Sequence, residues 1–405
     1  MRIVVSVTSE VWRDTGGGAE SARPLVPEHE IASLTAVREL VAVAVPGGPA
    51  FVETLQRIWD RGDALMPIDP RLPTPAIDLL ISVLRPASLV DESGDERHVP
   101  GGQRVEDGDA LVVATSGSTG VPKGVVHTHA SVAASAEATS ARLAVDPGGD
   151  RWLCCLPLAH VAGLSVVTRA LHSGTPLEVH PAFDADAVMD AARRGATLST
   201  VVPTALARID PSAFRKLVVG GSAPPAVLPE NAVVSYGMTE TGSAFVYDGV
   251  PLDGAEVRIV DGEIQVRGPM VLRAYRDGTV PTDAQGWLPT NDGGEWDDDG
   301  RLVVHGRRGD LIITGGENVW PNAVELVLSR HPAVAEVAVV GRPDPEWGQT
   351  VVAVIVPTDP TRPPSLAALR DHVKQVLPAF CAPRVVEAVD ALPRTLLGKV
   401  ERRSL

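Results

Sequence analysis

The stretch TSGSTGVPKG at residues 115–124 combines glycines, hydroxyl side chains and a lysine. Glycines let backbone N–H groups converge on an anion, hydroxyls add hydrogen-bond donors, and an ammonium group adds positive charge. This combination is typical of a polyphosphate site. The order is not that of a Walker loop, which requires Gly-Lys-Ser/Thr where this chain has Pro122, Lys123 and Gly124. A flexible Ser/Gly turn is the simpler alternative.

The loop directly follows a β-branched run, ALVVAT at 110–115, which predicts a buried strand. Similar runs recur along the first part of the chain: RIVVSV near the start, then 151–158, 198–204, 216–221 and 231–237. Ala-rich stretches with helical spacing separate them, at 130–145 and 184–196. Continuous apolar strands that alternate with helices predict an α/β fold with a parallel sheet covered on both faces.

The pattern of predicted secondary structure changes twice along the chain. After residue 245, short strands alternate with acidic, Gly-rich turns, which predicts a small β-rich subdomain. From about residue 310, two helices at 322–331 and 365–377 alternate with strands in an α+β pattern. Because one core usually stops growing at roughly 250–300 residues, several domains are expected. We predict an N-terminal domain over 1–308 and a C-terminal domain over 309–405.

Composition disfavours several classes of partner. The 405 residues carry 36 Lys and Arg against 51 Asp and Glu, a net charge of −15, and no basic stretch suits nucleic acid or an anionic membrane. The start is not typical of a signal peptide, and no apolar run reaches the roughly 18 residues of a spanning helix. Three cysteines, two of them adjacent, suggest neither a disulfide framework nor a zinc site. We expect a cytoplasmic protein.

The phosphate-type loop resembles the signature of the adenylate-forming superfamily, which includes acyl-CoA synthetases, nonribosomal adenylation domains and luciferases. Further motifs of this superfamily follow in order over almost the whole chain. The resemblance implies layered α/β sheets and a small β-rich subdomain in the large N-terminal domain, followed by a small mobile α+β domain. It also implies that the loop residues handle the β- and γ-phosphates of ATP: Thr115, Ser116, Gly117, Ser118, Thr119, Gly120 and Lys123.

Three more segments are similar to nucleotide-binding motifs of the superfamily. VVGGSAPP at 218–225 resembles the turn that packs against adenine, which implicates Gly220, Gly221, Ser222 and Ala223. In YGMTETG at 236–242, Tyr236 with Gly237 would contact adenine, Thr239 the α-phosphate, and Glu240 would be the Mg²⁺ ligand; alone, this heptapeptide also fits a capped helix start. In GWLPTNDGG, Asp292 would bind the ribose, and Asn291 replaces the glycine of the family pattern, which makes the local turn atypical. Arg307 would contact ribose or phosphate.

The acid pocket is less clearly marked. LPLAHVAGL at 156–164 resembles the segment whose histidine or aromatic residue lines the acyl pocket, here His160. A histidine in an apolar stretch also fits an ordinary core position. Ser165 and Thr204 are further pocket candidates by position only. A dicarboxylic acid would require an arginine or several hydroxyl donors nearby.

The chain contains only four lysines, Lys123, Lys216, Lys374 and Lys399. LPRTLLGKVERR at 392–403 resembles the terminal motif whose lysine enters the active site, which makes Lys399 the expected catalytic partner of the transferring phosphoryl group. Two of the four lysines therefore fall on motif positions. Gly309 occupies the expected hinge between the domains, where glycine allows backbone rotation.

The resemblance implies a ligase that uses ATP, Mg²⁺ and coenzyme A to convert a carboxylic acid to an acyl-adenylate and then to a thioester. GGENVWP and WGQ are most similar to o-succinylbenzoate–CoA ligases of menaquinone biosynthesis, especially short actinobacterial forms. A ligase for another aryl or acyl acid, which could load a carrier protein, is a second hypothesis. A catalytically silent nucleotide- or acyl-binding regulator is a third. A homodimer is compatible with the sequence but not indicated by it.

Overall fold

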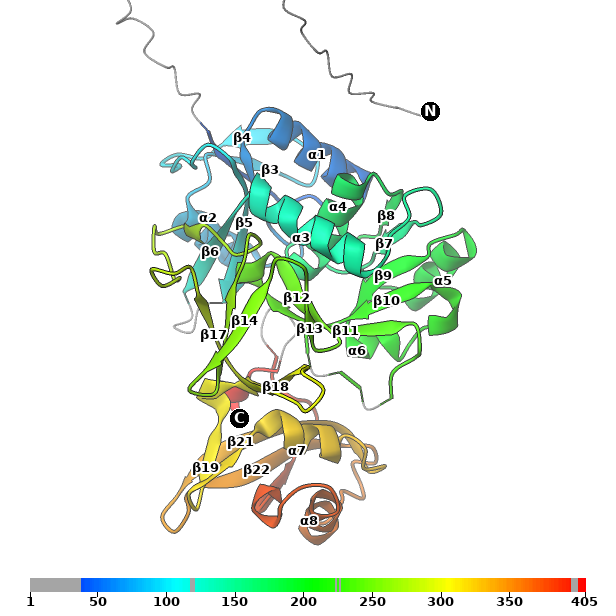
Figure 1. The fold of residues 1–405 in the computed structure, drawn as a ribbon, viewed down its shortest axis with the longest axis vertical. Helices are drawn as coiled ribbons and strands as arrows, with labels where there is room; N and C mark the ends of the chain where they lie inside the picture. Colours follow the sequence, from blue (N-terminus) through cyan, green and yellow to red (C-terminus); the bar gives the residue numbers. More distant parts are fainter. Residues whose placement is uncertain (1–37, 117–120, 223, 226, 395–399) are drawn as a thin grey trace, which may run out of the picture. The chain divides into compact units, whose positions relative to one another are not determined.

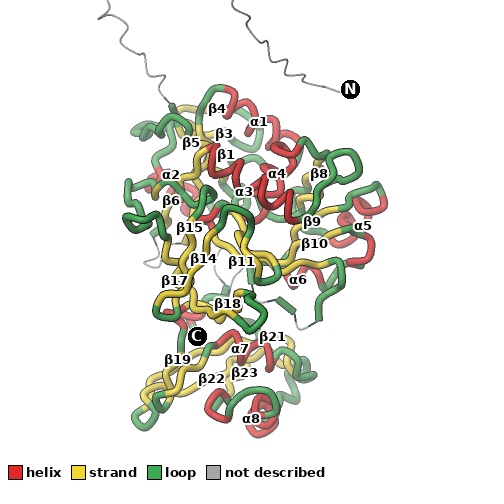
Figure 2. The backbone as a smooth tube through the Cα atoms, in the orientation of Figure 1, coloured by secondary structure: helices red, strands yellow, loops and turns green. Residues whose placement is uncertain are grey.

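The computed structural model describes residues 38–116, 121–222, 224–225, 227–394 and 400–405 (Figure 1). The predicted strand RIVVSV therefore lies outside the described residues. The described residues form four β-sheets, with helices packed against them (Figure 2). No helix in the described part of the chain is long and apolar enough to cross a membrane.

The first sheet has the strand order β16-β6-β5-β2-β1-β3-β4. Its strands are β1 (Leu40–Val43), β2 (Ala64–Pro67), β3 (Ser88–Val90), β4 (Glu96–His98), β5 (Asp109–Ser116), β6 (Pro122–Thr128) and β16 (Ala274–Tyr275). The helices of this region are α1 (Pro49–Asp60), α2 (Thr74–Leu84) and α3 (His129–Arg142). The strands β1, β2, β3 and β5 run parallel, but β6 pairs antiparallel with β5. The sheet is thus mixed rather than wholly parallel.

The second sheet has the order β13-β12-β11-β10-β9-β7-β8. Its strands are β7 (Trp152–Cys154), β8 (Leu177–Val179), β9 (Leu198–Val201), β10 (Lys216–Val219), β11 (Ala232–Met238), β12 (Ser243–Tyr247) and β13 (Val250–Pro251). Its helices are α4 (Val161–Ser173), α5 (Ala185–Arg193) and α6 (Pro203–Leu206). The strands from β8 to β11 are parallel, as predicted, whereas β12 and β13 turn back antiparallel.

The β-rich segment expected after residue 245 forms the antiparallel meander β14-β15-β17-β18. Its strands are β14 (Glu256–Val260), β15 (Glu263–Arg267), β17 (Leu288–Trp296) and β18 (Leu302–Arg307). The last sheet contains β19 (Ile312–Thr314), β20 (Glu317–Val319), β21 (Val334–Asp344), β22 (Gly348–Pro357) and β23 (Val385–Ala388), with α7 (Pro321–Leu328) and α8 (Leu366–Lys374). This α+β segment has a hydrophobic core of its own.

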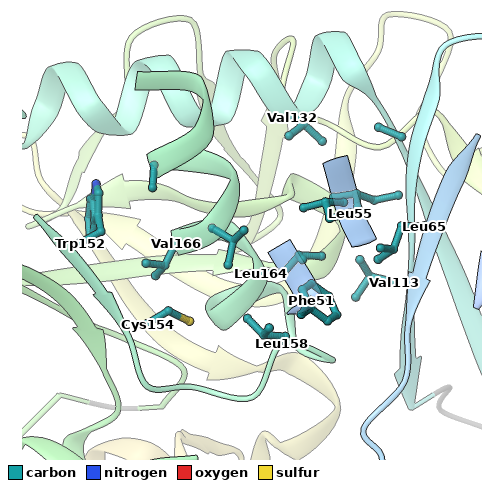
Figure 3. Packing of buried hydrophobic residues seen from close by; sticks show 14 of the residues in the cluster. Phe51, Leu55, Leu65, Val113, Val132, Trp152, Cys154, Leu158, Leu164 and Val166 are labelled. Carbon is teal, nitrogen blue, oxygen red and sulfur yellow. The ribbon is translucent and has the colours of Figure 1, made fainter. Parts of the chain in front are cut away.

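One hydrophobic core joins the first two sheets (Figure 3). Phe51 and Leu55 of α1 and Val113 of β5 belong to the same cluster as Trp152 and Leu164. The helices α3 and α4 lie side by side (Figure 1) and contribute to this core, so their apolar faces are removed from water together. The three cysteines are free and buried, at positions 154, 155 and 381.

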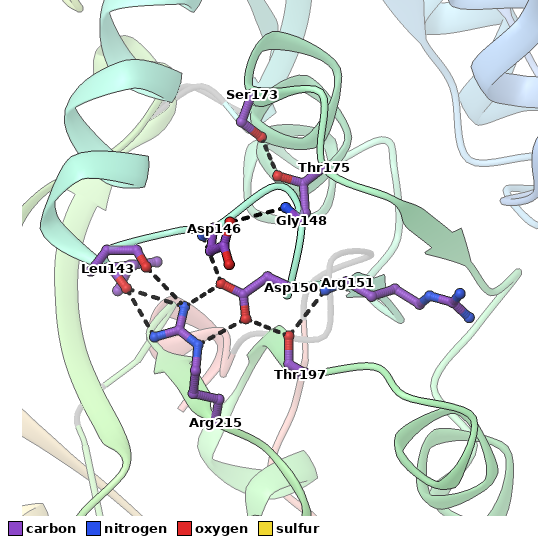
Figure 4. A network of polar contacts seen from close by, with 10 residues as sticks. Leu143, Asp146, Gly148, Asp150, Arg151, Ser173, Thr175, Thr197 and Arg215 are labelled. Atoms are coloured by element: carbon purple, nitrogen blue, oxygen red, sulfur yellow. Dashed lines mark hydrogen bonds and ion pairs between the residues drawn. The ribbon is translucent and has the colours of Figure 1, made fainter. Parts of the chain in front are cut away.

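A buried ion pair fastens the end of α3 to the second sheet (Figure 4). Asp150 is 6% exposed and accepts hydrogen bonds from Arg215 Nε at 2.8 Å and Nη2 at 2.6 Å, and from the Thr197 hydroxyl at 2.7 Å. Arg215 also donates to the carbonyl oxygen of Leu143 at 3.2 Å. Burial opposes the charge of Asp150, but Arg215 and Thr197 hold the pKa of this carboxyl below its usual range. Because each polar group has its partner, the pair orders the loop without leaving a buried charge unpaired.

Candidate active site

The polyphosphate-type loop joins β5 to β6 in an antiparallel hairpin. Thr115 lies opposite Lys123 in the ladder, and Ser116 lies opposite Pro122. The central residues Gly117, Ser118, Thr119 and Gly120 lie outside the described residues. The predicted strand over 110–115 is confirmed as β5, whereas residues 122–124, which were predicted as part of the loop, begin the return strand β6. This strand brings the exposed Lys123 next to the end of β5, where an anion held by the loop would meet its charge.

Thr239 and Glu240 stand at the end of β11, in the 3₁₀ turn Thr239–Thr241. Gly237, two residues before Thr239, packs closely against β12. A Cβ at this position would lie 2.3 Å from Ala244 Cα, so only glycine fits. The buried ring of His127 reaches the Thr239 carbonyl oxygen through Nε2 at 2.7 Å, and its Nδ1 lies 3.2 Å from the Ser131 hydroxyl. Burial lowers the pKa of His127 to about 4, so the ring is neutral at physiological pH. His127 of β6 thus fixes the position of this turn through the Thr239 carbonyl oxygen.

Tyr236, Asp292 and Arg307 form a linked polar group. The Tyr236 hydroxyl donates to Asp292 Oδ2 at 2.7 Å, and Arg307 Nε lies 3.2 Å from Asp292 Oδ1. Arg307 also donates to the Thr290 carbonyl oxygen at 2.9 Å. Asn291 has φ +58°, a left-handed conformation that asparagine adopts more readily than most residues other than glycine. The atypical asparagine thus takes a left-handed conformation within β17, directly before Asp292, in place of the turn that was expected.

The second glycine-rich turn follows β10. A Cβ at Gly220 would lie 2.4 Å from the Ser235 hydroxyl, and Gly221 has φ +84°, so both positions favour glycine. Ser222 is exposed beside them, and Ala223 lies outside the described residues. The turn lies at the carboxyl end of β10, beside Ser235 of the parallel strand β11, and α/β proteins commonly bind ligands at this edge of a sheet.

The three acid-pocket candidates occupy different positions. His160 is a half-buried N-cap of α4, which disfavours the core alternative. Ser165 is buried and lines a small cavity with His127 and Gly242, although its hydroxyl already donates to the Ala162 carbonyl oxygen at 3.1 Å. Thr204 is exposed at the start of α6 and is not among the residues that line this cavity.

Arg169, which sequence reasoning did not select, is a buried cation near this cavity. It follows Thr168 of the cavity wall on α4, is 2% exposed, and donates from Nη2 to the hydroxyl of Ser243, next to Gly242. Its Nε and Nη1 have no hydrogen-bond partner among the described residues. The guanidinium also lies 5.9 Å from the centroid of the Trp152 ring, within the range of a cation–π interaction, but none of its N–H groups bonds to a carboxylate among the described residues. The sequence of α4, VAGLSVVTRALHS, contains one arginine in a largely apolar helix, and this pattern could have indicated a buried cation.

Two predicted positions are not tested by this geometry. Lys399 lies outside the described residues. Gly309 lies in the 3₁₀ turn Arg308–Asp310, and a Cβ at this position would meet no atom within 4 Å. The conformation described here therefore does not itself require glycine at 309.

Comparison with known proteins places these motifs in a family. The family model for AMP-binding enzymes matches residues 85–276, and the model for the C-terminal domain of AMP-binding enzymes matches residues 323–399. A protein of Mycobacterium tuberculosis named probable 2-succinylbenzoate–CoA ligase is 40% identical over 330 residues, which are 75% of this chain and 85% of the relative. The chain belongs to the AMP-binding enzyme family.

Other relatives of this AMP-binding enzyme cover more of its length. The 2-succinylbenzoate–CoA ligase of Bacillus subtilis is 32% identical over 392 residues, 87% of this chain and 80% of the relative. The solved o-succinylbenzoate–CoA synthetase of the same species, in complex with its acyl-adenylate, has a TM-score of 0.80 at 29% identity, with 91% and 88% of the chains covered. A structure of that synthetase with ATP and magnesium ion has the same TM-score and identity.

The residues of the AMP-binding enzyme fit a magnesium site in which the protein and the phosphates of the substrate both supply ligands. Among the described residues, no three His, Cys, Asp or Glu side chains form a metal cage. Mg²⁺ is commonly held by one or two carboxylates together with substrate phosphates. Glu240 offers one carboxylate, whose Oε1 accepts a hydrogen bond from the Tyr275 hydroxyl at 2.9 Å. The ion would offset phosphate charge at this position.

Proposed function

We propose that this chain is an ATP-dependent, AMP-forming 2-succinylbenzoate–CoA ligase. The substrate carboxylate attacks the α-phosphorus of ATP, which gives an acyl-adenylate and pyrophosphate. The thiol of coenzyme A then attacks the acyl carbon, and AMP leaves with the bonding electron pair. The observation that carries the choice of acid is the 40% identity to a relative named probable 2-succinylbenzoate–CoA ligase, over 85% of that relative, and the buried guanidinium of Arg169 offers a cation for a second carboxylate.

The residues of the nucleotide site act by binding and orientation. Thr115 and Ser116 with the loop glycines and hydroxyls bind the phosphates, and Lys123 adds a positive charge. Thr239 contacts the α-phosphate, Tyr236 stacks on adenine beside Gly220–Ser222, and Asp292 with Arg307 binds the ribose. The pair Tyr236–Asp292 supports this assignment because the hydroxyl fixes the carboxylate that must accept bonds from the sugar.

The acid is bound with its reacting carboxylate near His160 and its distal carboxylate toward Arg169. A second carboxylate would accept a hydrogen bond from either Nε or Nη1, which lie on different sides of the guanidinium, and so offset the buried positive charge. An acid without this group leaves the cation unpaired and is bound more weakly. This supports a dicarboxylic aryl acid such as 2-succinylbenzoate, the substrate in the names of the relatives.

The C-terminal segment supplies the catalytic lysine and moves between the two steps. Lys399 stabilises the charge that grows on the transferring phosphoryl group. The domain boundary lies between 308 and 309, where Gly309 acts as the hinge. Coenzyme A, the small acid and ATP are the partners in this proposal, the location is the cytoplasm, and a homodimer is compatible with it.

An acid panel tests the proposal. Pyrophosphate release is measured with ATP, Mg²⁺ and 2-succinylbenzoate, benzoate, other aryl acids and short-chain acids. We expect release with 2-succinylbenzoate above all. Release with another acid alone would replace the substrate, and no release with any acid would favour the regulator hypothesis. Mass detection of the product formed with coenzyme A or with a phosphopantetheinylated carrier protein identifies the acceptor.

A further inference from the structure

Tyr275 contacts two residues from separate nucleotide motifs. Its hydroxyl donates to Glu240 Oε1 at 2.9 Å. The Nζ of Lys123 lies 5.0 Å from the centroid of the same ring, within the range of a cation–π interaction. One side chain therefore contacts both the candidate Mg²⁺ ligand and the phosphate-binding lysine.

Backbone hydrogen bonds fix the segment that carries this ring. Leu272 N donates to the Glu240 carbonyl oxygen at 2.8 Å, and Arg276 N donates to the Gly124 carbonyl oxygen at 2.7 Å. Between them, Ala274 and Tyr275 form β16 and pair with β6, the strand that begins beside Lys123. The segment thus spans from the Glu240 turn to the Lys123 strand, with the ring between them.

Two arginines flank Tyr275 and hold the segment against the first sheet. Arg273 makes two hydrogen bonds of 2.8 Å to Asp109, which is 1% exposed. Arg276 donates to the carbonyl oxygens of Leu84 at 3.1 Å and Arg104 at 2.7 Å. A Cβ at Gly124 would lie 2.9 Å from Arg276 Cβ, so glycine lets the two backbones approach. These contacts give the ring little freedom to move.

We propose that Tyr275 is a positioning residue that sets Glu240 and Lys123 in place for Mg²⁺-bound ATP. Its hydroxyl occupies Oε1 of Glu240 and leaves Oε2 for the cation. Its ring face holds the Lys123 ammonium on the side of the phosphates. This inference rests on the proposed ATP-dependent function.

Tyr275→Phe separates the two contacts, since it removes the hydroxyl and keeps the ring over Lys123. We expect calorimetric titration of ATP to show an unchanged affinity without Mg²⁺. Mg²⁺ should still strengthen ATP binding, but the Mg²⁺ concentration needed for half of this effect should rise about tenfold. The reason is that the charged Glu240 loses the hydrogen bond from the Tyr275 hydroxyl. Tyr275→Leu should also weaken ATP binding without Mg²⁺, because the cation–π contact is lost as well.

Glu240→Gln tests whether the hydroxyl acts through Glu240. If it does, adding Tyr275→Phe to Glu240→Gln raises the Mg²⁺ requirement little further, whereas independent effects multiply. Tyr247→Phe is the matched control, because the hydroxyl of this buried tyrosine donates a long hydrogen bond of 3.5 Å to Thr139, which is not one of the candidate nucleotide-binding residues. Circular dichroism and thermal melting of each variant report folding.

An unchanged Mg²⁺ requirement in folded Tyr275→Phe, or independent effects in the double variant, would overturn the inference. If Tyr275→Phe does not fold, Tyr275→Trp, which keeps an aromatic face without the phenol oxygen, takes its place. If neither folds, the role is structural and the inference is wrong. Wild-type protein that binds no ATP with Mg²⁺ would refute the proposed function instead, so the two failures are distinguishable.

Discussion

The hydroxyl of Tyr236 donates a 2.7 Å hydrogen bond to Oδ2 of Asp292, across 56 positions of sequence. Burial and the Asp292 charge raise the pKa of Tyr236, so the phenol remains the donor over the working pH range. The ring proposed to bind adenine and the carboxylate proposed to bind ribose are therefore directly linked. A substitution of Tyr236 on β11 should alter the position and hydrogen bonding of Asp292 on β17.

Tyr236→Phe should therefore raise the KM for ATP about tenfold, since the Asp292 carboxylate loses a charge-assisted hydrogen bond while the ring remains. The KM for the acid should change little. Steady-state kinetics with each substrate varied in turn measures both values. Equal changes in both constants would contradict a role confined to the nucleotide.

Lys399→Ala should abolish adenylation but largely spare thioester formation from a preformed adenylate, because in the proposed role the ammonium offsets charge only in the first step. Pyrophosphate release and thioester mass measure the two half-reactions separately. Lys374→Ala is the matched control, because among the described residues Lys374 forms a long ion pair of 4.0 Å with exposed Asp371. Equal loss of both half-reactions in Lys399→Ala would refute the assigned role.

Arg169→Met should raise the KM for 2-succinylbenzoate roughly 10- to 100-fold, which corresponds to the loss of one charge-assisted pair. Turnover of benzoate, which lacks the second carboxylate, should not fall. The free energy of unfolding should stay equal or increase, because an unpaired buried charge is replaced by an apolar chain of similar length. Urea denaturation and kinetics test this, with Arg208→Met as a control, an arginine stacked on Phe183. A parallel loss for both acids would show that Arg169 does not recognise the second carboxylate.

His127 should make the protein less stable in acid. The pKa of this buried ring is about 4, below its ordinary value of 6.5, so the unfolded chain binds the extra proton first as pH falls. The contribution is complete above pH 6.5 and is lost progressively toward pH 4, by about 3 kcal/mol in total. Urea titrations across this window measure it. His127→Gln, whose amide N–H can replace Nε2, should show a flatter profile, and an identical profile would count against this cause.

Gly309→Pro should restrict rotation at the proposed hinge, because proline fixes φ. Proline also disfavours the helical conformation of the preceding Arg308, so circular dichroism and thermal melting first establish that the variant folds. We expect at least one half-reaction to survive while the coupled reaction is strongly slowed. Gly309→Ala should behave nearly as wild type, because a Cβ meets no atom there. Normal coupled turnover in the folded proline variant would argue against a hinge at this position.

The candidate-site residues that belong to local motifs could be proposed from the sequence, and those that depend on contacts between distant segments could not. Lys123, Glu240 and Asp292 belong to short, glycine-containing motifs, so the motif alone is enough to propose them as site residues. His127 reaches Thr239 across 112 positions and Tyr275 reaches Glu240 across 35, and periodicity carries no information about either pairing. The strand β6 was missed because its first residues were assigned to the loop.

The burial of all three cysteines has a chemical consequence for a protein that handles a thiol cosubstrate. Burial raises the pKa of Cys154 to about 12 and of Cys155 to about 11, and it also raises that of Cys381. The thiolate is the reactive form, so none of them competes as a nucleophile at neutral pH. The activated acyl group then meets no rival sulfur on the protein, and disulfides of coenzyme A find no partner for exchange. The burial of the three cysteine thiols thus helps to restrict thioester formation to the thiol of coenzyme A.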